Sequence, residues 1–244
     1  MPTAVRKRTH EWLQFCQSGN SETVFQVMQD ACRGWFGLED IPAIPKFLSG
    51  ETLTKLLKAN LMSATFPNFS FSEQTHAPGL QFDSVLRAIS GLEESRRLYS
   101  GVYLVDFTPV ADFATPRDPM YTTIASLAIK RSSETPPGSR FDIPGEDWGM
   151  VSMAYADSLD LGWLEGRLER AIEFYAISNL FGRRYRTLQW FADSFTRLGV
   201  RHQLYGNDVT PASREPQLMI DSEVGNAAYP NVAGRPIFRF PSVQ

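Results

Sequence analysis

The stretch YGNDVTPASREPQLMIDSEVGNAAYPNVAGRPIFRFPSVQ, residues 205–244, decides how the rest of this chain is interpreted. It carries five prolines, spaced so closely that no long helix or strand fits between them. It also keeps apolar side chains such as Leu218, Ile220 and Tyr229, in which disordered segments are poor. The composition therefore predicts an extended, irregular C-terminal arm that lies on a surface, either of its own domain or of a neighbouring subunit.

Four residues near the end of this arm, Ile237, Phe238, Arg239 and Phe240, are the segment that we expect to bind a partner. In an extended chain, Ile237 and Arg239 would face one side, and Phe238 and Phe240 the other. Such a segment can add to a neighbour as a strand through main-chain pairing. It can equally fold back and cover its own domain, so pairing in cis and in trans both stay open.

The remaining residues, 1–204, are expected to form a single α+β domain with a helical N-terminal part. Apolar residues at helical spacing predict helices over residues 5–17, 21–36, 50–61 and 84–92. In the second of these, Ser21 is a good N-cap and Gly37 ends the pattern.

The middle of the chain changes to β-rich segments. Strands are expected over residues 101–107, 121–129 and 148–155, although the second segment is also compatible with a helix. Residues 132–145 are polar, contain three prolines and predict an exposed loop. Three strands with connections of this length favour a small antiparallel sheet.

Two further helices are predicted before the arm, over residues 160–175 and 188–198. In the second, apolar residues are spaced three, four and three apart, and Gly199 fits its C-cap. The pair has the pattern of a helical hairpin.

The composition is that of an ordinary globular protein, with a net charge of −3 that does not by itself call for nucleic acid or an anionic membrane. Cys16 and Cys32 fall in apolar helical settings and are predicted to be buried free thiols. This use of cysteine favours a reducing compartment such as the cytoplasm, and a virion is also compatible. No apolar run approaches the roughly 20 residues of a membrane span.

No motif for catalysis, cofactor binding or metal binding is found. The chain lacks the G-x-S-x-G, G-x-G-x-x-G and P-loop patterns, and its three histidines have no partner at metal-ligand spacing. We therefore expect no metal and no cofactor. Asp106 is the unusual carboxylate, because it lies inside an apolar strand, either as an edge residue facing water or as a functional acid.

An arginine-rich run, Arg183, Arg184 and Arg186, is the best candidate for binding nucleic acid or another anion. Tyr185 lies within the run and Trp190 follows, and arginines with interleaved aromatic rings can grip phosphates and stack on bases. A solvated basic helix face, or pairing with a neighbouring subunit, explains the same residues.

These observations favour a structural or interaction subunit of a larger assembly, such as a virion, a phage particle or a multi-subunit complex, that contacts its neighbours through extended termini. The absence of catalytic motifs argues against an enzyme. One alternative is a small enzyme or ligand-binding domain whose site is built from distant residues. The other is an RNA-binding protein that uses the arginine run.

Overall fold

The computed structural model describes residues 20–37, 48–71, 96–108, 117–181, 188–197, 200–209 and 217–241. The helices and strands in these ranges are α2 (Ser21–Phe36), α3 (Gly50–Lys58), β1 (Leu61–Phe66), β2 (Phe69–Ser70), β3 (Arg97–Leu98), β4 (Gly101–Asp106), α5 (Tyr121–Ser126), the 3-10 turn η3 (Gly145–Asp147), α6 (Trp148–Ser158), β5 (Glu165–Leu168), α7 (Ala171–Phe181), β6 (Leu188–Arg197), β7 (Val200–Val209), β8 (Gln217–Val224), β9 (Val232–Gly234) and β10 (Pro236–Arg239). The expected α+β class is confirmed.

The central sheet has the strand order β1-β4-β10-β5, and all its neighbouring strands are antiparallel. Its last strand in sequence, β10, is therefore an inner strand. Ile237 lies opposite Val105 of β4 on one side and opposite Arg167 of β5 on the other. The sheet would be split into two parts without this segment.

The prediction that residues 205–244 are irregular is wrong for the end of β7 and for β8, β9 and β10. Gly206 is paired inside β7, whereas the last glycine and the last two prolines stand at the ends of short strands. Gly234 is the last residue of β9, Pro236 is the first of β10, and Pro241 follows it. The first position of a strand tolerates proline, so a proline-rich sequence can still contribute strands when they are short.

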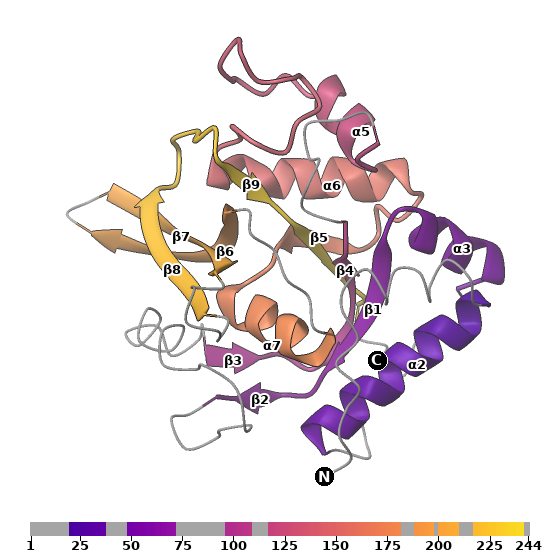
Figure 1. Ribbon diagram of the computed structural model, residues 1–244. Coiled ribbons are helices and arrows are strands. Elements are labelled where there is room, and N and C mark those ends of the chain that lie inside the picture. Colours follow the sequence, from indigo (N-terminus) through magenta and orange to yellow (C-terminus); the bar gives the residue numbers. More distant parts are fainter. Residues whose placement is uncertain are drawn as a thin grey trace.

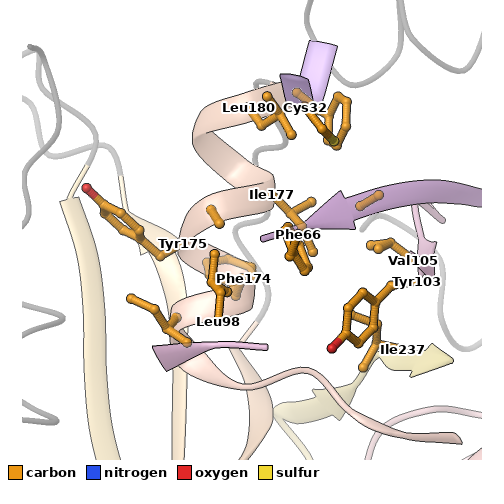
Figure 2. Close-up of a cluster of buried hydrophobic side chains, with 14 of the residues drawn as sticks. Cys32, Phe66, Leu98, Tyr103, Val105, Phe174, Tyr175, Ile177, Leu180 and Ile237 are labelled. Carbon is orange, nitrogen blue, oxygen red and sulfur yellow. The ribbon is translucent and has the colours of Figure 1, made fainter. Parts of the chain in front are cut away.

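The two faces of the central sheet carry separate apolar cores. Val105 and Ile237 belong to the core shared with α7 and most of the buried face of α2, whereas Leu104 and Phe238 belong to the core shared with α3, α5 and α6. Figure 1 shows α6 and α7 on opposite sides of these strands. Figure 2 shows the first core, with Ile237 beside Tyr103 and Val105. The alternation predicted for the last strand is thus present, with a filled core on each side.

A second sheet has the order β8-β7-β6-β9, in which β9 runs parallel to β6. The helix predicted over 188–198, and with it the helical hairpin, is wrong because this segment is β6. Trp190 and Phe191 are both fully buried, each in a different core. A strand buried on both faces has consecutive apolar residues, which removes the alternation by which strands are recognised.

The helix predicted over 160–175 is divided into β5 and, farther on, α7. Gly166 explains the strand, because both the sheet and α6 come close to its backbone. A Cβ atom at this position would lie 3.0 Å from the ring of Phe238 and 3.2 Å from the carbonyl carbon of Ser152. Glycine thus permits α6 to pack tightly on β5.

The segments expected as strands over 121–129 and 148–155 contain α5 and α6 instead; for the first, a helix was the stated alternative. In α6, Trp148, Val151 and Tyr155 are buried at helical spacing. The helical spacing of these buried residues is hard to see in the sequence, because the apolar Met150 and Met153 lie between them and are exposed to solvent. The apolar character of those two methionines concealed the helical pattern in the sequence.

The predictions for the N-terminal half agree better with the structure. Helix α2 covers the predicted range, although Asn20 and not Ser21 supplies the N-cap side chain. Helix α3 is shorter than predicted, since Leu61 begins β1, and β4 matches the predicted strand. The helices predicted over 5–17 and 84–92 lie outside the described residues.

Cys32 is a buried free thiol, as predicted, whereas Cys16 lies outside the described residues. Burial raises the pKa of the Cys32 thiol to about 12, despite a hydrogen bond that the Thr65 backbone N–H donates to Sγ at 3.3 Å. Cys32 is therefore a core residue and not a reactive one.

Removing the last two strands tests this architecture. A chain ending at Tyr229 lacks β9 and β10, and we expect it to lose cooperative urea unfolding and its near-ultraviolet circular dichroism. The reason is that β4 and β5 would lose their common neighbour and both cores would open. A chain ending at Pro241 is the matched control and should unfold like the full-length protein. Cooperative unfolding of the shorter chain would contradict the arrangement.

Candidate functional site

The four residues predicted to bind a partner have different surroundings. Ile237, Phe238 and Phe240 are at most 3% exposed and pack within the chain's own cores. Arg239 is half-buried, donates a hydrogen bond from Nη2 to the Ser100 carbonyl at 3.0 Å, and lies beside the Tyr103 ring. The segment therefore pairs in cis, and only its Arg239 end and the adjoining Phe240 border the surface.

The arginine run of the sequence, Arg183, Arg184 and Arg186, lies outside the described residues. The binding of RNA or another anion through it stays a prediction.

Asp106 is neither an edge residue facing water nor an exposed acid, but part of a buried ion network. One carboxylate oxygen accepts a hydrogen bond from Arg140 Nη1, and the other accepts one from the Thr108 backbone N–H at 2.8 Å. Arg140 also contacts Asp118 through Nε and Nη2, at 2.8 and 2.9 Å. Arg235 Nη1 lies 3.8 Å from Asp106 and donates to the Thr108 carbonyl at 2.8 Å.

The network is balanced in charge, with two aspartates and two arginines, and each of these residues is at most 5% exposed. Burial alone would raise the pKa of Asp106, but the charges of Arg140 and Arg235 outweigh it and hold that pKa below its ordinary value. A general acid near neutral pH needs a raised pKa and access to a substrate. Asp106 has neither, so its role is to connect the end of β4 to the loops that contain Asp118 and Arg140.

A second ion network fixes the start of α7. The carboxylate of Glu173, fully buried, accepts two hydrogen bonds from Arg167, at 2.7 and 2.8 Å, and one from the Arg170 backbone N–H at 2.9 Å. The Arg170 guanidinium lies over the Tyr99 ring at 4.6 Å. Asp193 accepts a hydrogen bond from the Ala171 backbone N–H at 2.6 Å. Two carboxylates thus satisfy the amides that begin the helix.

Both networks therefore have structural explanations. Among the residues whose burial the structure describes, three large apolar side chains are exposed: Met150 (48%), Met153 (61%) and Trp163 (45%). All three come from α6 and the turn that follows it. Exposed apolar side chains that are close in the sequence make this segment the candidate interaction surface.

A surface hollow of about 240 Å³ adjoins Trp163 and is lined by Trp163, Glu165, Arg239, Phe240 and Pro241. The indole of Trp163 packs against the ring of Phe240 in a tilted arrangement, with the ring centroids 5.7 Å apart. We call this feature the Trp163 hollow. Its volume is below the roughly 300 Å³ at which pockets for small-molecule ligands begin, and it suits a single side chain of a partner better.

No protein-family model, curated protein or solved structure matches this chain. Within the described ranges, no group of three or more His, Cys, Asp and Glu side chains is arranged to hold a metal ion. In the same part of the chain, no helix has the length and apolarity needed to cross a bilayer.

Sequence reasoning missed the surface because it assigned α6 as a strand and did not consider Trp163. A turn signal was present, since Gly162 precedes Trp163 and marks a chain reversal that leaves the indole at the surface. The partners of Asp106 had no such signal, because Arg140 is 34 residues away in the sequence and Arg235 is 129 away.

Replacing Asp106 by asparagine tests whether the first network is structural. The change removes one of the two negative charges of the network, so that Asp118, the partner of Arg140, is its remaining carboxylate. We expect the free energy of unfolding in urea to fall by about 3–5 kcal/mol, the cost typical of breaking a buried ion pair.

The matched control is Asp160→Asn, which removes an exposed ion pair to Lys55 with an N–O distance of 3.2 Å. Exposed pairs contribute at most about 1 kcal/mol, so this variant should stay near the wild type. Equal effects of the two substitutions would contradict a structural role for the buried network.

The pH dependence of stability tests the second network. Burial alone would raise the pKa of Glu173, but the charge and hydrogen bonds of Arg167 and the contacts of Arg170 lower it from 4.5 to about 2. The folded state thus holds the proton less tightly than the unfolded state. The resulting stabilisation is fully present above pH 4.5 and is lost as the pH falls toward 2; it amounts to about 3 kcal/mol.

Urea titrations of the wild type and Glu173→Gln between pH 7 and about pH 2.5 measure this contribution. We expect the difference in unfolding free energy between the two proteins to be constant near neutral pH and to shrink below pH 4.5. Glu134→Gln, at an exposed position, is the matched control. A difference that does not change with pH would show that the ionised carboxylate is not the stabilising group.

Proposed function

We propose that the protein is an interaction subunit of a larger assembly, and that it binds a protein partner through the surface of α6 and the Trp163 hollow. The observation that carries this proposal is the position of the exposed apolar side chains. Met150, Met153 and Trp163 lie within fourteen consecutive residues, 150–163, whereas every other large apolar side chain whose burial the structure describes is at least partly buried.

The chemistry of the hollow supports a protein partner. Tryptophan and arginine are the residue types most enriched among those that dominate binding energy, and methionine is enriched in interfaces generally. The Trp163 hollow places an exposed tryptophan next to Arg239 and Glu165. A partner side chain seated there would bury apolar surface against Trp163 and Phe240 while its polar groups reach the two charges.

The rigidity of the surroundings supports the same proposal. Phe240 is 3% exposed and belongs to the core between the central sheet and α6, and its backbone N–H donates to the Val102 carbonyl at 3.0 Å. One wall of the hollow is therefore fixed by the inner strands of the sheet. A preformed site loses less conformational entropy on binding than a mobile one.

Site-specific photocrosslinking tests the proposal in cells that naturally make the protein. A benzophenone amino acid at position 163 should give a discrete product with a partner, and the same probe at the exposed Ser133 should not. A product with twice the mass of the chain would identify a second copy as the partner.

The substitution Trp163→Ala provides an independent readout. We expect recovery of the crosslinked partner with the purified protein to fall about tenfold or more, as for an interface residue that dominates binding. The unfolding midpoint should change little, because the indole is nearly half exposed. Absence of any product from position 163, or full recovery of the partner with folded Trp163→Ala, would overturn the proposal.

A further inference from the structure

Helix α6 and the 3-10 turn η3 before it present four exposed side chains. Glu146, Met150, Met153 and Asp157 follow one another at intervals of four, three and four residues. Met150, Met153 and Asp157 share one face of α6, and Glu146 precedes them in the turn that leads into the helix. All four residues are exposed, while Trp148, Val151 and Tyr155 on the other face are buried. We call these four residues the α6 stripe.

The stripe is apolar in the middle and acidic at both ends. Glu146 belongs to the turn η3 that leads into the helix, and Asp157 lies in its last turn. At the rise of an α-helix, their positions are about 17 Å apart along the axis. The two methionines lie between them and offer apolar surface that a partner can bury.

The charged residues of the segment that contains the stripe are all acidic. Residues 145–160 contain Glu146, Asp147, Asp157 and Asp160 and no lysine, arginine or histidine. Of these four, Asp160 alone has an ion pair with another described residue, Lys55, and both side chains of that pair are more than half exposed. The acidic residues of the stripe itself therefore remain available to cations of a partner.

We infer that the occupant of the α6 stripe is a basic, amphipathic helical segment of the partner protein. This inference rests on the function proposed above. Its apolar side chains would cover Met150 and Met153. Its lysines or arginines, about three helical turns apart, would meet Glu146 and Asp157. Methionine suits this role because its flexible side chain adapts to the shape of an incoming apolar surface.

The same charges argue against other occupants. A second copy that offered its own α6 stripe would bring acidic residues against acidic residues. An anionic membrane surface or a nucleic acid would be repelled for the same reason. Charge complementarity thus selects a cationic protein segment.

Binding of defined peptides tests the inference. The probe is a fluorescein-labelled helical peptide of about 16 residues, long enough to span the stripe, with leucine on one face and lysine on the other. Two comparison peptides replace every lysine by glutamate or every leucine by serine. Fluorescence anisotropy with the full-length protein should show binding of the leucine–lysine peptide that weakens with added salt, and binding at least about tenfold weaker for both comparisons.

Variants of the protein show whether the stripe is the binding site. We expect the double variant Met150→Ser/Met153→Ser and the single variant Asp157→Lys each to weaken binding about tenfold. Glu134→Lys makes the same change of charge at an exposed position away from α6 and should bind like the wild type. Unfolding midpoints check that each variant is folded.

Failure of the leucine–lysine peptide to bind, or equal weakening by Glu134→Lys and Asp157→Lys, would overturn this inference. Tight binding of the leucine–glutamate peptide would do so as well. The proposed function is judged separately, by crosslinking at position 163. A crosslinked partner together with no peptide binding would retain the interaction site and reject the basic helical segment as its occupant.

Discussion

The insertion of β10 between β4 and β5 is the constraint on which the rest of the structure depends. This short strand supplies Ile237 to one core and Phe238 to the other, so both apolar layers are completed by the end of the chain. It also joins the two sheets, because only Arg235 separates it from β9, which pairs with β6. The folding of the domain therefore requires its C-terminal segment, and this segment is not available as a free arm.

Buried charge reinforces the same region. Arg235 connects the junction of β9 and β10 to Asp106 at the end of β4, and Arg140 connects Asp106 to Asp118. On the opposite side, Arg167 of β5 holds Glu173 at the start of α7. In these pairs, the buried carboxylates and arginines of both networks neutralise one another and connect elements of the fold. The exposed side chains of α6 and the Trp163 hollow are therefore the basis of the proposed interaction surface.

Parts of this account could be predicted from the sequence, and the reasons for the failures are physical. Helix α2 and strand β4 have one buried face or a short apolar run, so local patterns were sufficient. The first part of β6 has consecutive buried residues on both faces, and α6 has methionines on its exposed face. Neither segment therefore shows the apolar period that identifies its type. The ion partners of Asp106 and the hollow beside Phe240 depend on segments brought together only by the fold, and no local spacing encodes them. The alternation of Ile237 and Phe238 was predicted, but not their place between two strands of the same chain.

The position of β10 is the central claim, and native-state hydrogen exchange tests it most directly. The measurement compares the amides of Phe238 and Phe240 with that of Leu104 in β4. If β10 is an inner strand, all three should exchange only by global unfolding, with protection that reports the full stability of the protein. If the C-terminal segment were a surface arm, the amides of Phe238 and Phe240 would exchange orders of magnitude faster than that of Leu104, and the account would be wrong.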